Sequence, residues 1–178
     1  RNAGIAGTNG VKDAKDKDEQ DDDLGGTIPE SDVTWKLVGA ELNLDGSGAT
    51  GDLTKETAPW SNSVDKVDTV IVGEGVTGLS KGLFTSELSA PADTVIFGSK
   101  TAWVPLDAFV SADGSETNGM AAVLFETNDG KYEAPSAWTD AAGNVYESYV
   151  EAIEAGATAV QPVFTTSTKV EEQIEKAP

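Results

Sequence analysis

The chain has 178 residues, 38% of them hydrophobic. This is enough for one domain with a substantial core, since a chain of roughly 150 residues buries about two-thirds of its unfolded surface. Its 31 acidic and 12 basic residues give a net charge of −19, which repels phosphate backbones, so nucleic acid is not an expected partner. The absence of cysteine and histidine removes thiol nucleophiles and the commonest neutral-pH base, which excludes most enzyme chemistry.

Residues 1–31 are poor in hydrophobic residues and rich in acidic ones, which is typical of a solvated low-complexity arm or linker. The spacing Asp16-x-Asp18 resembles the opening of a calcium loop, although the glycine and the distal glutamate of such a loop are not in place. The candidate ligands for Ca²⁺ are Asp16, Asp18, Asp21 and Asp23. No other feature calls for a cofactor.

The chain begins at Arg1, and its one methionine is Met120. We expect a processed form or an excised piece, and a removed signal peptide would place the protein outside the cell or on its surface. No run approaches the roughly 18 apolar residues needed to span a bilayer, so no transmembrane segment is expected.

Residues 32–178 are expected to form a single β-rich domain. Apolar and polar residues alternate over 33–37 and 42–44, which is the period-two pattern of a half-buried hairpin. An irregular connector follows up to residue 66, in which Trp60 is predicted to pack into the core. This part, residues 32–66, would cap the rest of the domain.

Residues 67–139 contain two clear repeats and a third in outline. "VDTVIVGEGVTGLSKGLF" (67–84) is followed by "ADTVIFGSKTAWVPLDAF" (92–109), with each phenylalanine 14 residues after the first aligned valine. In the third unit, 122–138, Leu124 is predicted to take the place of that valine and Trp138 that of the phenylalanine. The aligned positions of the first and second units are then 25 residues apart, and those of the second and third units are 29 residues apart.

Each unit consists of a short β-branched strand, a turn and a second segment that ends in an aromatic residue. So short a strand cannot bury its apolar side chains unless a neighbour stacks upon it, which favours a solenoid. Ordinary hairpins in a β-sandwich share the same turn chemistry. The predicted fold class is therefore mainly β, a small stacked-strand or sandwich-like body with one short helix near the C-terminus.

Residues 140–178 are predicted to form a helix and a terminal strand. "GNVYESYVEAIEAG" has Asn144 three residues before Glu147, a near match to a capping box, and a glycine stop, which predicts a helix of about three turns. "ATAVQPVFTTSTKVEEQI" then alternates as a strand would. Pro162 lacks an amide proton, which indicates an edge position.

The opening of this domain resembles the BspA-like leucine-rich-repeat surface proteins of anaerobic bacteria over residues 32–112. The matching positions are Val33, Thr34, Trp35, Ala58, Pro59, Trp60, Val70, Ile71, Gly73, Val76, Thr77 and Phe84. The resemblance implies an extracellular, cell-surface protein with a stacked-strand body that adheres to or binds host or matrix components. The family's isoleucine-glycine pair before the aromatic is replaced here by Leu79-Ser80 and Val104-Pro105, and three units at most cannot form a long concave surface.

No catalytic residue is assigned. Two carboxylates could in principle hydrolyse a glycoside, but nothing selects a pair among 31 acids. "GEGVTG", Gly73 to Gly78, has no lysine in the phosphate-loop position and is better explained as a turn. A carboxylate-based glycoside hydrolase is the least favoured hypothesis, and we expect a non-enzymatic protein.

Two non-enzymatic classes stay open. In the first, a secreted structural or adhesive subunit assembles into filaments with itself or with another surface protein, by adding a terminal strand that contains Val160, Phe164 and Val170. In the second, the protein binds carbohydrate or a host protein. Trp103 is the candidate ligand-binding residue, because this bulky ring lies in a turn where the first repeat has only "GVTG".

Overall fold

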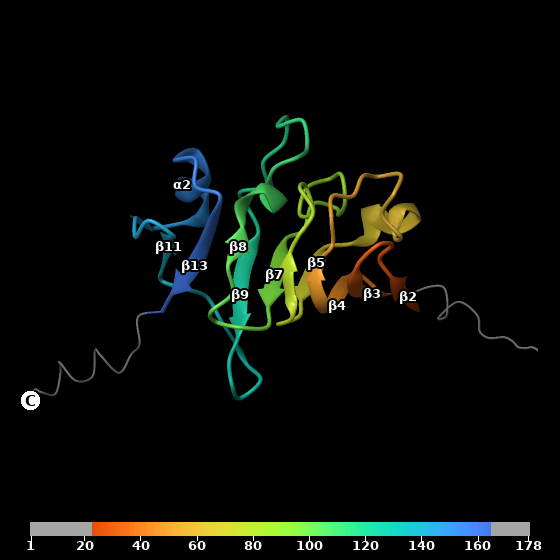
Figure 1. Ribbon diagram of the computed structural model, residues 1–178, viewed down its shortest axis with the longest axis horizontal. Helices are drawn as coiled ribbons and strands as arrows, with labels where there is room; N and C mark the ends of the chain where they lie inside the picture. The colour runs from red at the N-terminus through yellow and green to blue at the C-terminus, as the bar shows by residue number, and fades with distance from the viewer. Residues whose placement is uncertain (1–22, 165–178) are drawn as a thin grey trace, which may run out of the picture.

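A computed structural model describes residues 23–164, which form two β-sheets that share one hydrophobic core (Figure 1). The larger sheet has the order β10-β9-β7-β5-β4-β3-β2, and β6 also pairs with β4. The smaller sheet has the order β12-β11-β13-β8. The prediction of a mainly β fold with a short helix near the C-terminus is confirmed.

The strands of the larger sheet are β2 (Asp23–Thr27), β3 (Asp32–Val38), β4 (Glu41–Ala49), β5 (Thr69–Val72), β6 (Val76–Gly78), β7 (Thr94–Phe97), β9 (Ala122–Glu126) and β10 (Tyr132–Glu133). Those of the smaller sheet are β8 (Val104–Pro105), β11 (Ala137–Asp140), β12 (Val145–Tyr146) and β13 (Ala159–Val163). The helical segments are η1 (Ser61–Lys66), η2 (Leu106–Phe109) and α2 (Tyr149–Glu154). Within residues 23–164, none of these helices is long and apolar enough to cross a bilayer.

The sequence repeats stack as neighbouring parallel strands. β5 pairs with β7 so that Val70 lies opposite Val95, as the alignment of the first two units predicts. The third unit was misaligned by one residue, because Val123 and not Leu124 lies opposite Val95. In "AVLFE" three consecutive apolar residues leave the register ambiguous, and Phe125, stacked on Phe97 with ring centroids 5.4 Å apart, identifies the inward face.

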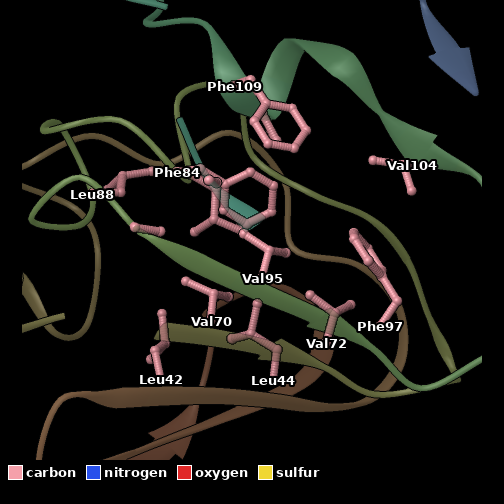
Figure 2. Close-up of a cluster of buried hydrophobic side chains, with 14 of the residues drawn as sticks. Leu42, Leu44, Val70, Val72, Phe84, Leu88, Val95, Phe97, Val104 and Phe109 are labelled. Atoms are coloured by element: carbon pink, nitrogen blue, oxygen red, sulfur yellow. The ribbon is translucent and has the colours of Figure 1, made fainter. Parts of the chain in front are cut away.

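The inward side chains of β4, β5, β7 and β9 form the centre of the core. Figure 2 shows the leucines of β4, the valines of β5 and Val95 of β7 pointing from successive strands toward Phe84 and Phe109. These two phenylalanines end the second segments of their repeats, and Phe84 donates its backbone N–H to Ala108 O at 2.9 Å. We call one repeat of the stack, from its parallel strand to its final aromatic residue, a coil. Successive coils are therefore joined by backbone hydrogen bonds as well as by side-chain contacts.

Two columns of aromatic rings run through this core. The first joins Phe84 to Phe109 at 4.8 Å and Phe109 to Tyr149 of α2 at 4.4 Å between ring centroids. The second runs from Phe97 through Phe125 to Trp138, which meets Tyr149 edge-on at 6.1 Å. Trp138 was predicted as the third ring of the first column, but Tyr149 holds that place because Trp138 belongs to β11.

The turn before β9 is fixed by a buried asparagine. The side-chain amide of Asn118 donates to the carbonyl oxygens of Phe84 and Ala92 at 2.8 and 2.7 Å, and its carbonyl oxygen accepts from Met120 N. These bonds satisfy backbone groups at the turn, and Phe84 O also accepts from Ala92 N at 3.2 Å. The segment before β9 is thus attached to residues 84 and 92 of the preceding part of the stack.

The antiparallel hairpin predicted at the start of the domain is formed by β3 and β4, with Trp35 opposite Leu44. A further strand, β2, pairs with β3 along its whole length. Residues 23–27 therefore belong to the sheet, although they were assigned to the acidic arm. Their sequence, "DLGGT", has one large apolar residue and so gives no strand pattern.

The C-terminal helix is shorter than predicted. α2 starts after Ser148, whose hydroxyl accepts from Glu151 N at 3.2 Å, so Ser148 and not Asn144 is the N-cap. Asn144 instead bonds to Asp140 in the turn between β11 and β12. Residues 145–146 are consequently a strand rather than the first helical turn.

β13 is not an edge strand, contrary to the expectation from Pro162. It lies between β11 and β8. The pairing with β8 involves only Ala159 and Val160, so Pro162 lies beyond it and faces a partner strand on the β11 side alone. The missing amide proton is tolerated for that reason.

We expect Phe109→Ala to lower the free energy of unfolding by about 3–5 kcal/mol, because it empties a fully buried position between two rings. Urea unfolding followed by tryptophan fluorescence measures the change. Met120→Ala is the matched control, since Met120 is 88% exposed and should leave stability unaltered. Equal stability of the two variants would contradict the packing described here.

Burial raises the pKa of Tyr149 to about 12 from its ordinary value of 10. The unfolded chain therefore releases this proton first as pH rises, and the native state loses stability between pH 10 and 12. Tyr149→Phe gives up the hydrogen bond to Ala121 O but removes this titration. The urea midpoint of unfolding is measured below pH 10 and near pH 12. We expect it to fall further between these pH values for the wild type than for the variant. Parallel losses would refute the assignment.

Candidate ligand groove

A groove runs along the carboxyl ends of the parallel strands β5, β7 and β9. It consists of three adjoining hollows that share lining residues, and the most enclosed one has a volume of about 370 Å³. We call it the edge groove; its principal lining residues are Gly73, Glu74, Thr77, Gly98, Ser99, Lys100, Thr101, Trp103, Glu126, Thr127, Asn128, Asp129, Lys131, Tyr132 and Glu133.

Two glycines let the turns that line the groove approach one another. Gly73 N donates to Leu44 O at 2.7 Å and Gly98 N donates to Val72 O at 2.9 Å, so each follows its strand at the same place in successive coils. A Cβ atom at Gly98 would lie 3.0 Å from the backbone nitrogen of Glu74. A side chain here would push neighbouring turns apart, which explains the glycine in both repeats.

The turn before Trp103 is held by hydrogen bonds. Ser99 Oγ accepts from Thr101 N at 3.2 Å, and Gln161 of β13 donates from Nε2 to Thr101 O at 2.8 Å. Directly after Trp103, β8 pairs with β13. The backbone on both sides of the indole is thus anchored to the smaller sheet.

Trp103 is the exposed tryptophan of the chain. Its side chain is 45% exposed, whereas Trp35, Trp60 and Trp138 are at most 8% exposed. It lines the most enclosed hollow of the edge groove and also a second hollow of about 360 Å³ on the smaller sheet. That second hollow is otherwise lined by Asp140, Ala141, Ala142, Gly156, Ala157, Thr158 and Ala159.

The other end of the groove is formed by the turn between β9 and β10. The Asp129 carboxylate accepts from the Thr127 hydroxyl and from Lys131 N, and these hydrogen bonds hold the pKa of Asp129 below its ordinary value. Tyr132 follows this turn and is 53% exposed. The groove therefore has one exposed aromatic side chain at each end.

The groove carries a negative balance. Four acidic side chains, Glu74, Glu126, Asp129 and Glu133, face two lysines, Lys100 and Lys131. Lys100 is already engaged, because Nζ lies 2.6 Å from Glu133 Oε1 and 4.5 Å from the centroid of the Phe164 ring. Lys131 is then outnumbered by the carboxylates, so an anionic ligand would meet net repulsion.

This combination of groups fits a ligand that is neutral and rich in hydroxyls. Exposed indole and phenol rings can stack on apolar ligand faces, while serine, threonine, asparagine and carboxylate groups exchange hydrogen bonds with hydroxyls. In the described part of the chain, no cluster of acidic side chains could hold a metal ion. The exposed rings and polar groups can contribute stacking and hydrogen bonds to recognition of such a ligand.

Of the candidate site residues predicted from the sequence, only Trp103 lines the edge groove. Val160 is fully buried between β11 and β8, and Phe164 packs on Phe125 at 5.8 Å between centroids. Asp23 belongs to β2. The other members of the two predicted sets lie outside the described residues: Asp16, Asp18, Asp21 and Val170.

Tyr132 and the polar lining were missed by the sequence reasoning. Their place depends on the stacking register, which brings turns 25 to 30 residues apart in the chain to one edge of the sheet. The turn itself has a signal, since "TNDGK" between two short apolar stretches is typical of a hairpin. Nothing in that motif says which other turns it will lie beside.

No family model matches the chain, and no curated protein matches it in sequence. Among solved structures, a leucine-rich repeat protein from Eubacterium ventriosum is similar to 58% of this chain with 17% identity and a TM-score of 0.38. The matched region spans 28% of that protein's length. A likeness at this level carries no conclusion about this chain.

Proposed function

We propose that this protein is a non-enzymatic binding module that holds a neutral saccharide in the edge groove. The observation that carries the proposal is the position of Trp103, an exposed indole on an anchored turn beside a hollow of about 370 Å³. A large apolar ring kept in solvent forgoes the burial that its three counterparts have. Stacking on a ligand would supply that burial.

The polar lining favours a saccharide over other neutral ligands. Hydroxyls of Ser99, Thr101 and Thr127 lie in the lining, where those of Ser99 and Thr101 bond to each other and that of Thr127 bonds to Asp129. Asn128 adds an amide that can both donate and accept. Alternating apolar faces and hydroxyl rims are the surface of a sugar ring. The two more open hollows offer no extended apolar pocket for a lipid or a steroid, since carboxylates and lysines lie throughout them.

Binding without hydrolysis is the preferred role, and the glycoside hydrolase hypothesis is kept only as the least favoured one. Glycoside hydrolysis needs one carboxylic acid that donates a proton and a second carboxylate that attacks or activates water. Glu133 is engaged by Lys100, and Asp129 accepts hydrogen bonds that favour its ionised form. Asp129 is therefore not suited to donate a proton to a leaving group, and nothing selects a catalytic pair among the groove carboxylates.

The setting we propose is outside the cell or on its surface, where the module would mediate adhesion to carbohydrate or to a host protein. This rests on the sequence resemblance and on the acidic composition, with a net charge of −19. Ordering of the N-terminal acidic residues by Ca²⁺ stays a prediction of the same kind. If Ca²⁺ orders these residues, its removal should lower the midpoint temperature of thermal unfolding.

Self-assembly is a second candidate role, favoured by one observation. β2 is the outermost strand of the larger sheet, and no strand among residues 23–164 pairs with its free side. A strand with unpaired backbone groups is a template for a partner strand. A structural or filament-forming role, alone or with another surface protein, is compatible with saccharide binding because the edge groove uses other residues.

We expect Trp103→Ala to weaken binding of a glycan, identified by array screening of the wild type, by roughly tenfold or more, since tenfold corresponds to about 1.4 kcal/mol of lost stacking. Titration calorimetry measures it. Trp103→Phe should retain part of the affinity, and Val145→Ala, at another exposed apolar position, should retain all of it. Undiminished binding by Trp103→Ala would refute the site, and an array without any bound glycan would refute the proposed ligand class.

Tyr132 at the far end should matter only for longer ligands. We expect Tyr132→Ala to reduce affinity for an oligosaccharide that reaches both ends of the groove, and to leave the affinity for its terminal mono- or disaccharide unchanged. Trp103→Ala should weaken both. Calorimetry with a length series of one glycan makes the comparison. The same loss at every length for both variants would contradict a ligand laid along the groove.

A further inference from the structure

We infer that the free edge of β2 accepts residues 165–170 of a second copy of this chain, so that copies join head to tail. The inference does not depend on the edge groove or on its ligand. It specifies both partners of the strand pairing: the acceptor is β2, and the donor is the segment that follows Phe164 in the sequence.

Within residues 23–164, the acceptor edge lacks the usual protection against a further strand. Proteins commonly shield an edge with lysine, proline, a bulge or a very short strand. β10, at the other end of the larger sheet, has only two residues, whereas β2 has five, among them Gly25 and Gly26 with no side chains. Neither proline nor lysine occurs in β2, and its pairing with β3 is regular throughout.

Leu24 supplies an apolar contact at this edge. It lies opposite Leu37, which is 2% exposed and faces the core, yet Leu24 itself is 37% exposed, and no strand among residues 23–164 lies outside it. A strand added to β2 would bring an inward side chain beside Leu24. A β-branched residue is favoured at that place.

Residues 165–170, "TTSTKV", match the acceptor in length and character. Four of the six are threonine or valine, which favour strands, and Lys169 is the only charged residue. Val170 is the apolar residue that would lie beside Leu24. The N-terminal segment is a poorer match, because Asp16, Asp18, Glu19, Asp21 and Asp22 would bring further negative charge to an acidic protein.

The donor must come from another copy, because its own β2 is out of reach. Phe164 packs on Phe125 of β9, and β2 is five strands away from β9 in the sheet order. The position beyond β2 is a sixth step, about 29 Å from β9 at roughly 4.8 Å per strand. The chain from Phe164 to Val170 spans only about 20 Å when fully extended. Figure 1 shows β13 and β2 toward opposite ends of the long axis.

Donor and acceptor at opposite ends give an assembly that does not close. A head-to-tail contact of this kind repeats along a line unless the rotation happens to form a ring. The net charge of −19 opposes association at low salt. Assembly should therefore become stronger as salt rises, unlike an association that depends on opposite charges.

Cysteine cross-linking tests the pairing directly, because the natural chain has no cysteine. Full-length L24C and V170C proteins are mixed at high salt under mild oxidation. We expect a disulfide-linked dimer in the mixture and a ladder of multimers from the L24C/V170C double variant. The control pair V145C with V170C, which places cysteine at an exposed site of the other sheet, should give only the collisional background.

Several outcomes would overturn the inference. One is cross-linking no greater than that of the control pair; another is a double variant that forms only an intramolecular disulfide. A third is cross-linking that appears only once residues 1–22 are removed, since the N-terminal segment would then occupy the edge. Sedimentation gives an independent readout: deletion of residues 165–178 should abolish the oligomer, and Trp103→Ala should leave it intact, which separates this inference from the saccharide site.

Discussion

The in-register parallel stacking of β4, β5, β7 and β9 is the constraint on which the rest of the structure depends. Because Leu42, Val70, Val95 and Val123 lie opposite one another, all their coils present the same face to the core. Every inward side chain then has a counterpart one strand away, so the aromatic columns can form. A slip of one residue would turn an entire strand to solvent, so register and core determine each other.

A stack of this kind exposes apolar surface at both ends, and the two ends are covered differently. At the start, the antiparallel strands β3 and β2 continue the sheet, and Trp35 packs against Trp60 at 5.9 Å between centroids. At the finish, Tyr149 meets both aromatic columns and bonds to Ala121 O. α2, which carries Tyr149, contacts β11 and β12, so the helix and the smaller sheet together cover this end of the stack, as capping elements do in repeat proteins.

How much of this could be predicted depended on how distinctive each segment is. "DTVI" occurs twice, so the pairing of β5 with β7 followed from the sequence. "AVLFE" offers three apolar residues in a row, and only the ring of Phe97 decides among them. Trp103 was recognisable as a bulky residue in a turn, whereas Tyr132 joins the same groove only through the register of β9. A sequence shows the chemistry of each segment, but it does not show which turns of successive coils will lie side by side.

The short stack also determines where a ligand can be held. The turns after β5, β7 and β9 are separated by about 4.8 Å per strand, so they span about 10 Å along the sheet. A broad surface across the strands would need many more coils. A groove along their carboxyl ends needs only a few turns, provided that glycine lets those turns meet, as Gly73 and Gly98 do. Three coils would therefore suffice for the proposed site at the edge of the sheet, and the indole of Trp103 also lines the hollow on the smaller sheet.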